Sequence, residues 1–346
     1  MLDLWNYLKQ TKKPIYLYGT GNGADKILDE LIRRNISVKG VFASDGFVRD
    51  RYFRGFKVIS FSDAISESPD LIALLSFGSQ LSDVIENIKE ISKKCELYAP
   101  DVEVIGGQSI FDLSYAKEHI DSLKQAYNLL ADDLSKKVFE NIVLYKLTGK
   151  LDYLFEIETD KSEAYSLLNF TDEESYLDIG AYNGDTVKEF IEYTKCSYQK
   201  IIAVEPDAKN FKKLTANTDK YKNVTLINAG ISDQKGTMLF AMRGGRNSSV
   251  GEGTEIVKES VDSILNGEKI SYIKMDVEGQ EYAAIKGAQK TLITHSPKLN
   301  IAAYHRNEDI FTLPLLINEM SPNYKIYMRH HPYVPAWDTN FYVIRG

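Results

Sequence analysis

Apolar and polar positions alternate in a repeating strand–helix pattern over the first third of the chain. Residues 15–18 form a short apolar run of strand type, and a glycine-rich turn follows directly. Residues 24–33 then carry apolar side chains at helical spacing, which predicts an amphipathic helix. Further predicted strands cover residues 37–42, 56–60 and 71–76. The pattern predicts a small Rossmann-like α/β domain over residues 1–112.

In the next segment the apolar residues recur only at helical spacing. From Ser114 to about Tyr153, apolar side chains recur three or four residues apart, with polar residues between them. Ser135 lies inside this pattern and is a point where it can divide into two helices. We interpret residues 113–170 as a helical connector between two α/β units.

The strand–helix alternation returns over residues 171–346. Predicted strands cover residues 176–180, 200–205, 224–229, 272–276, 298–304, 324–329 and 339–344, and 236–241 is a hairpin arm. Predicted helices cover residues 186–193, 209–217, 281–293 and 313–320. Repeated βα units predict a mostly parallel sheet with helices on both faces. The last strand follows its neighbour without a helix, which indicates an antiparallel edge strand.

Composition limits the classes of protein to consider. The chain has 346 residues and a formal net charge of -7, which argues against a reader of duplex nucleic acid. Cys95 and Cys196 lie far apart in sequence, so we expect two reduced thiols. The N-terminus does not resemble a signal peptide, and no apolar stretch is long enough to cross a bilayer. These features predict a cytoplasmic protein without a membrane span.

Polar residues gather where the predicted strands end, which is where doubly wound sheets bind ligands. The first strand of the C-terminal unit runs into a turn with two glycines and acidic residues, a poor match for pyrophosphate. The turn suits a ligand with an ammonium group and hydroxyls, such as S-adenosylmethionine, although a plain βα turn explains it too. Its candidate binding residues are Asp178, Gly180, Ala181, Asn183, Gly184, Asp185 and Thr186.

The next two strand ends extend this candidate binding site. Glu205 and Pro206 follow the second strand, about twenty residues beyond the turn, where a carboxylate accepts ribose hydroxyls in dinucleotide folds. A surface glutamate is the equally weighted alternative. Asn228 and Ala229 end the third strand and are small or polar enough to face an adenine ring.

Candidate catalytic residues follow the fourth and fifth strands. Alternation along an extended chain puts Lys274, Asp276 and Glu278 on one side, and His305 follows the neighbouring strand. Glu281 fits the ordinary role of an acidic residue in a helix's first turn. The histidines show no standard zinc spacing, so we assign no metal ligands. A hard cation held by Asp276, Glu278 and a third ligand stays an open alternative that the sequence does not support.

These motifs, in this order, resemble the FkbM family of methyltransferases. The resemblance runs from about Leu130 to the C-terminus. It rests on residues 178–186, 205–207, 261–264 and 273–281, and on Phe211, Leu214, Asn217, Tyr304, His305, Asp309 and Pro314. The most specific stretch is the Lys-x-Asp-Val-Glu-Gly sequence of residues 274–279.

The resemblance implies a class I methyltransferase fold, S-adenosylmethionine as methyl donor, and O-methylation of sugars or other hydroxylated metabolites. It does not identify the acceptor. Within such a site our hypothesis makes His305 the general base, with Asp276 orienting it or the acceptor. The N-terminal domain is not part of the family's core and looks similar to small Rossmann-like domains attached to sugar-modifying enzymes.

Three alternatives remain open from the sequence. The turn at Gly19, Gly21 and Gly23 could bind NAD with Asp45 on a ribose, although it departs from the full dinucleotide fingerprint. The N-terminal domain could instead bind a nucleotide sugar and deliver it to the methyltransferase, or the methyltransferase fold could be a scaffold.

Residues 242–255 are rich in glycine and arginine and are either a lid for an acidic or phosphorylated acceptor or a surface loop.

Overall fold

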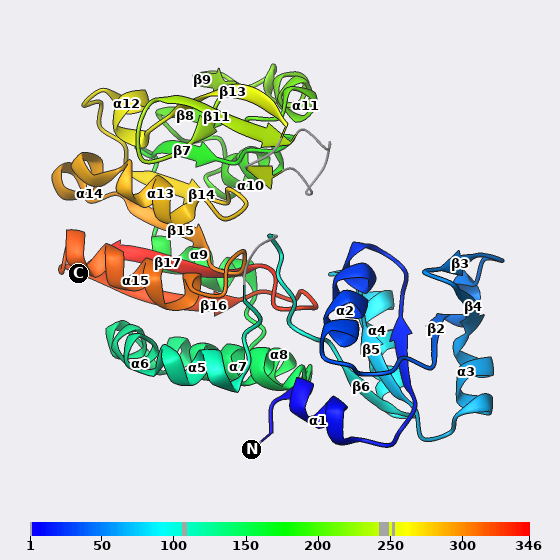
Figure 1. Cartoon of the computed structure of the whole chain (residues 1–346). Coiled ribbons are helices and arrows are strands. Elements are labelled where there is room, and N and C mark those ends of the chain that lie inside the picture. Colours follow the sequence, from blue (N-terminus) through cyan, green and yellow to red (C-terminus); the bar gives the residue numbers. More distant parts are fainter. Residues whose placement is uncertain (1, 106–108, 242–248, 251–252) are drawn as a thin grey trace. The chain divides into compact units, whose positions relative to one another are not determined.

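The computed structural model describes residues 2–105, 109–241, 249–250 and 253–346 (Figure 1). The chain forms two compact units. The first contains residues 1–120, 137–158 and 330–338, and the second contains residues 121–136, 159–329 and 339–346. Residues 242–248 and 251–252 of the predicted lid lie outside the described residues.

The first unit is built on a six-stranded sheet with the order β3-β4-β2-β1-β5-β6. All neighbouring strands in it are parallel except β3, which is antiparallel to β4. The elements are α1 (Leu4–Gln10), β1 (Ile15–Tyr18), α2 (Asn22–Arg33), β2 (Gly40–Ala43), β3 (Tyr52–Phe53), β4 (Phe56–Ser60), α3 (Phe61–Glu67), β5 (Ile72–Leu75), α4 (Ser82–Ser92) and β6 (Glu96–Tyr98). A 3₁₀ turn covers Asp45–Phe47.

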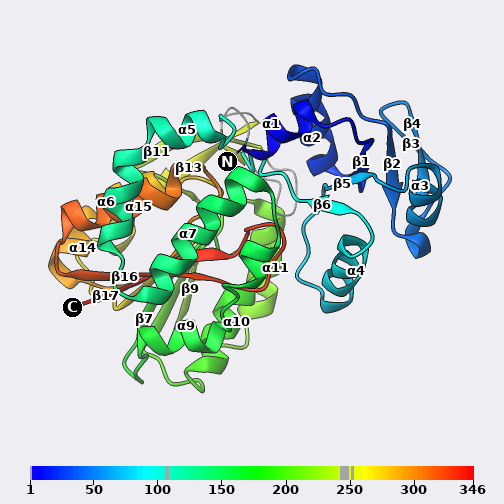
Figure 2. The same ribbon diagram turned by 90° about the horizontal axis from the view of Figure 1, so that it is seen from below.

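The alternation of side chains along β1 explains the two layers of this unit. Ile15 and Leu17 join a core with α1 and α2, whereas Tyr16 and Tyr18 point to the other face and pack against Phe42. Because both faces are buried, the strand is a continuous apolar run in the sequence. Figure 2 shows α1 and α2 on one side of the sheet and α4 on the other. This is the Rossmann-like arrangement predicted for residues 1–112.

The predicted connector is helical, but its helices are divided between the two units. They are α5 (Leu113–Glu118), α6 (Ile120–Leu129), α7 (Asp133–Thr148), α8 (Asp152–Phe155) and α9 (Lys161–Leu168). The break falls between Leu129 and Asp133, just before Ser135 rather than at it. The Asp132 carboxylate accepts the Ser135 backbone N–H at 2.7 Å and so caps the start of α7. The boundaries of the predicted domains stay a prediction.

The second unit contains a seven-stranded sheet with the order β16-β17-β15-β14-β7-β8-β9. Its strands are β7 (Ser175–Ile179), β8 (Lys200–Val204), β9 (Val224–Ile227), β14 (Tyr272–Met275), β15 (Lys298–Ala302), β16 (Tyr324–His330) and β17 (Thr339–Arg345). Strands β9, β8, β7, β14 and β15 pair in parallel, and β17 is antiparallel to β15. The predicted antiparallel strand is therefore present, one position inside the edge, which β16 forms.

Helices cover both faces of this sheet, as predicted. They are α10 (Asp185–Tyr193), α11 (Ala208–Thr218), α12 (Val261–Leu265), α13 (Glu281–Lys286), α14 (Gln289–His295) and α15 (Asp309–Met320). Tyr176, Tyr272 and Tyr342 point from the sheet into a core with α9 and α10. Figure 1 shows α13, α14 and α15 on the opposite side. The class I methyltransferase-like α/β fold is confirmed.

The second unit also contains a small four-stranded sheet. The order β10-β13-β11-β12 joins β10 (Gly230–Ile231), β11 (Gly236–Ala241), β12 (Ser249–Val250) and β13 (Thr254–Glu259), so the predicted hairpin arm is confirmed in β11. Cys95 and Cys196 are free thiols. In the described part of the chain, every helix is too short or too polar to cross a membrane.

Candidate active site

The turn after β7 is shaped by Gly180. Its φ is +82°, and a Cβ atom added to it would lie 1.9 Å from the backbone oxygen of Asp276. The N–H groups of Gly180 and Ala181 both donate to the carbonyl of Val204 at 3.0 Å. Glycine is therefore required here because the ends of β7 and β14 approach each other closely, bringing two predicted site segments together.

The polar residues at the start of this turn face inward. Asp178 has no exposed surface, and its carboxylate accepts a hydrogen bond from the Thr186 hydroxyl at 2.5 Å. The Lys274 ammonium lies 3.6 Å from the other carboxylate oxygen of Asp178. Burial raises the pKa of Asp178, although Lys274 and Thr186 partly offset it. Asp178 and Thr186 bond to each other and help to fix the shape of the turn, and their role as ligand contacts stays a prediction.

Lys274 is the cation that links the first and fourth strand ends. Its Nζ donates to the Gly180 carbonyl at 3.3 Å and lies 3.8 Å from an oxygen of Asp276. Burial alone lowers the pKa of Lys274, but Asp178 and Asp276 outweigh burial and raise it. Lys274 is thus a fixed positive charge between the two segments rather than a proton acceptor.

Glu205 lies at the end of β8 and is almost fully buried. Its two carboxylate oxygens accept the backbone N–H groups of Tyr182 (2.9 Å) and Asp207 (3.0 Å). Burial raises its pKa to about 7, and the two N–H groups oppose this rise. A carboxylate offers about four lone-pair sites, so Glu205 retains capacity for further hydrogen-bond donors.

The remaining predicted binding residues surround Glu205. The Asn228 amide donates to the carbonyls of Glu205 (2.8 Å) and Pro206 (3.2 Å), so it holds the loop after β8. Ala229 is buried. On the rim, Asp185 is exposed, and Asn183 accepts its N–H at 3.2 Å. Gly184, with a φ of +87°, starts α10.

The fourth strand end differs from the sequence prediction in its backbone. The extended chain stops at Met275, and Glu278 has a φ of +50°. The alternation of side chains along a strand therefore does not determine the direction of the Glu278 side chain. Instead a turn brings it beside Asp276. The carboxylate of Asp276 accepts the Tyr304 hydroxyl at 3.2 Å, and its side chain is 37% exposed. Asp276 and Glu278 therefore give the site an accessible acidic surface.

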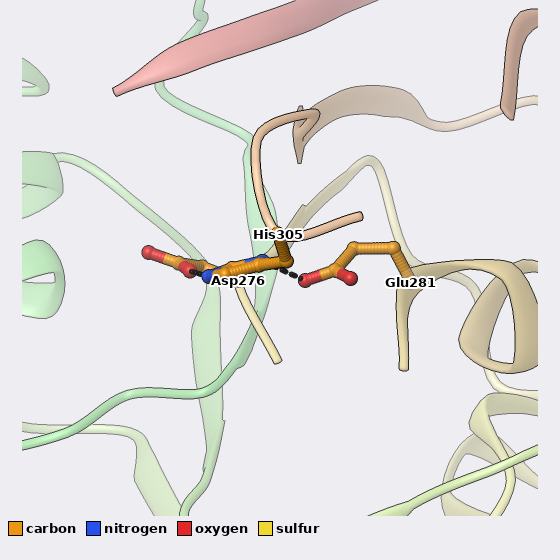
Figure 3. A group of neighbouring side chains, drawn as sticks. All are labelled: Asp276, Glu281 and His305. Atoms are coloured by element: carbon orange, nitrogen blue, oxygen red, sulfur yellow. Dashed lines mark hydrogen bonds and ion pairs between the residues drawn. The ribbon is translucent and has the colours of Figure 1, made fainter. Parts of the chain in front are cut away.

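His305 is buried, and its ring lies between the carboxylates of Asp276, which follows β14, and Glu281, the first residue of α13 (Figure 3). Its Nδ1 donates to Glu281 Oε1 at 2.8 Å. Its Nε2 lies 3.5 Å from oxygens of both Asp276 and Glu278. Burial lowers the pKa of His305, but Glu281, Glu278 and Asp276 together outweigh burial and raise it to about 10. These contacts favour a charged imidazolium at neutral pH.

Glu281 is the residue of this cluster that sequence reasoning missed. It was assigned to the first turn of a helix, and it does open α13, but its side chain is fully buried and bonded to His305. The available signal was its place in the crowded acidic stretch after the fourth strand. Periodicity could not reveal that the α13 terminus faces the residues after β15.

Comparison with known proteins then identifies the domain. Residues 178–324 match the family model described as the methyltransferase FkbM domain. The second unit contains an FkbM methyltransferase domain. The match spans each of the strand ends described above, from the turn after β7 to α15, so the sequence-based recognition is confirmed.

One solved structure supports the fold of the whole chain. The crystal structure of methyltransferase FkbM from Methylobacillus flagellatus KT has 24% sequence identity and a TM-score of 0.74, covering 96% of this chain and 90% of that one. A precorrin-6y C5,15-methyltransferase from Geobacter metallireducens GS-15 has 12% identity and a TM-score of 0.36, covering 54% and 86%. The second likeness is too weak to carry an argument. A comparison with curated proteins finds no match.

The acidic cluster of the FkbM domain includes groups of metal-ligating type. Asp276, Glu281 and His305 each place one potential ligand atom within 4.8 Å of the others. Figure 3 shows the imidazole ring between the two carboxylates, so each ring nitrogen faces a different one. We interpret the arrangement as a charged His305 imidazolium paired with the carboxylates of Asp276 and Glu281.

The glycine turn outside the FkbM domain is also explained by packing. A Cβ on Gly23 would lie 2.4 Å from the Ser76 carbonyl oxygen, so this glycine lets α2 approach the end of β5. The Asp45 carboxylate accepts the Ser62 N–H (3.0 Å) and hydroxyl (2.5 Å). That engagement disfavours Asp45 as a ribose ligand. Nucleotide-sugar binding by the first unit stays a prediction.

Proposed function

We propose that this chain is an S-adenosylmethionine-dependent O-methyltransferase that acts on a hydroxyl of a sugar, a nucleotide sugar or a related glycan metabolite. The observation that carries the proposal is the meeting of the β7, β8, β14 and β15 ends in one FkbM domain. Ligands of such sheets bind at this edge.

The residues present fit the chemistry of the donor. S-adenosylmethionine supplies an electrophilic methyl group on a sulfonium. Glu205 accepts two backbone N–H groups and retains hydrogen-bonding capacity for a ribose hydroxyl. Exposed Asp185 and the neighbouring Asn183 provide oxygen acceptors for an ammonium group. Asn228 keeps the loop around Glu205 in place.

The geometry favours Asp276 as the group that accepts the hydroxyl proton, with His305 as its charged partner. A protonated His305 cannot act as a base, so the roles first assigned to these two residues are exchanged. Asp276 is partly exposed and lies beside Lys274 and His305. A carboxylate next to two cations is a weak base. It accepts the proton late, once formation of the O–C bond has made the hydroxyl acidic.

The test is to titrate the full chain with S-adenosylmethionine in a calorimeter and to screen sugars and nucleotide sugars for transfer of a labelled methyl group. Asp276→Asn should leave donor affinity unchanged and lower turnover by roughly 10²–10⁴-fold. Asp219→Asn, on the exposed end of α11, is the matched control. Equal turnover of the two variants would remove Asp276 from the reaction, and absence of donor binding would contradict the proposed function.

A further inference from the structure

Glu281 has an unusual environment for the first residue of a helix. Acidic side chains at this position ordinarily lie in solvent and interact with the helix dipole. Glu281 is instead fully buried, and α13 is a helix of six residues. Burying a carboxylate is costly unless its oxygens are paired. The helix dipole alone therefore does not explain why an acidic residue occupies this position.

The contacts of Glu281 join two parts of the site. Its Oε1 accepts the Val277 backbone N–H at 2.8 Å and the His305 Nδ1–H at 2.8 Å. Val277 directly follows Asp276 in the chain, so one oxygen atom fixes both the backbone next to Asp276 and the ring of His305. Its Oε2 is buried without a hydrogen-bond partner among the residues that the structure describes.

We propose that Glu281 is a positioning residue of this site: its carboxylate holds the imidazole of His305 against Asp276 and keeps the imidazole protonated. This inference rests on the proposed function. Glu281 itself is too deeply buried to touch an acceptor. It acts through His305, whose Nε2 faces the accessible carboxylates of Asp276 and Glu278 at 3.5 Å.

The charges around His305 define what loss of Glu281 should do. Carboxyl groups face the ring from the α13 terminus (Glu281), from the turn after β14 (Asp276 and Glu278) and from α15 (Asp309, which is also buried). Glu281 is the largest of the contributions that raise the pKa of His305. Replacing it by glutamine keeps an oxygen for the Val277 N–H but removes the charge. The proton on His305 should then be lost at a lower pH.

The first measurement needs no acceptor. Imidazole NMR of the full wild-type chain should show His305 protonated throughout pH 6–8. In Glu281→Gln its midpoint should fall by at least one pH unit, while Glu192→Gln, an exposed control on α10, should match the wild type. A wild-type midpoint near the ordinary value of 6.5 would overturn the proposal, even if Glu281→Gln did not fold.

The second measurement is turnover against pH with an acceptor found in the methyl-transfer screen. Glu281→Gln should bind S-adenosylmethionine as tightly as the wild type and turn over at least tenfold more slowly, because the ring of His305 no longer holds Asp276 in place. It should also lose activity at a lower alkaline pH, because an Nε2 without its proton turns a lone pair toward the Asp276 carboxylate. A purely structural role would lower thermal stability without moving this alkaline limb. An unmoved limb would contradict the role of Glu281, whereas absence of methyl transfer by the wild type would contradict the proposed function.

Discussion

The close approach at Gly180 predicts a large effect of adding a single methyl group. An alanine Cβ would lie 1.9 Å from the Asp276 carbonyl oxygen, whereas ordinary contacts begin at 3.4 Å. The backbone of β7 or β14 must therefore move by about 1.5 Å, the difference between these distances. Neither atom belongs to a flexible side chain, so no rotamer change can relieve the contact.

The expected cost has two parts that a matched variant separates. A residue other than glycine at positive φ costs about 1–2 kcal/mol. Gly267 has a φ of +85° and open space around its Cβ position, so Gly267→Ala measures this backbone cost alone. Gly180→Ala adds the clash, for which overpacking of a closed interior gives about 1–3 kcal/mol more.

The clash also predicts a functional loss, because it displaces Asp276. A misplacement of about 1 Å is expected to lower turnover about 100-fold. Chemical denaturation of both variants, donor titration and methyl-transfer assays give the three readouts. Equal stability losses, with unchanged turnover in Gly180→Ala, would refute the inferred close contact between the β7 and β14 ends.

Three further predictions follow from other contacts. Because the pKa of Glu205 is raised to about 7, its ionised form is lost as pH falls through 7, and affinity for S-adenosylmethionine should weaken up to tenfold per pH unit below that value. Calorimetry should show no such dependence for Glu205→Gln. Asp132→Asn removes the negative charge that lies 2.6 Å from the buried Arg329 guanidinium. It should cost about 2 kcal/mol in a denaturant titration, less than a fully buried pair because Asp132 is one-third exposed. Calorimetry should show no binding of NAD, because the Asp45 carboxylate already accepts hydrogen bonds from the N–H and hydroxyl of Ser62. Measurable binding would restore the alternative of a dinucleotide site in the first unit.

Local sequence patterns predicted the elements better than their ends. The sequence predicts one strand over residues 298–304, but β15 ends at Ala302. Ala303 is buried, although the parallel pairing with β14 has already stopped at Ile301. Hydrophobicity reports burial, whereas a strand ends where its pairing partner ends. The position of β17 between β15 and β16 is a similar case, since pairing between distant segments decides strand order.

The strand-end rule located the site but not the direction of each side chain. It brought Asp178, Lys274, Asp276 and His305 to one edge, and the structure places them there. It could not show that Asp178 points inward while Asp276 points outward, because the two residues occupy different places relative to their strand ends. The paired position of Asp178 across from Lys274 buries both groups in the sheet.

The net negative charge around His305 bears on which acceptors the proposed site would favour. Asp276, Glu278 and Glu281 surround the imidazolium of His305, so the carboxylates outnumber this cation. The buried oxygen of Glu281 cannot reach solvent, so the negative surface that an acceptor meets comes from Asp276 and Glu278. Such a surface attracts hydroxyl donors and repels phosphate at short range. Under the proposed function, a nucleotide sugar would present a hydroxyl to Asp276 with its diphosphate away from these two carboxylates.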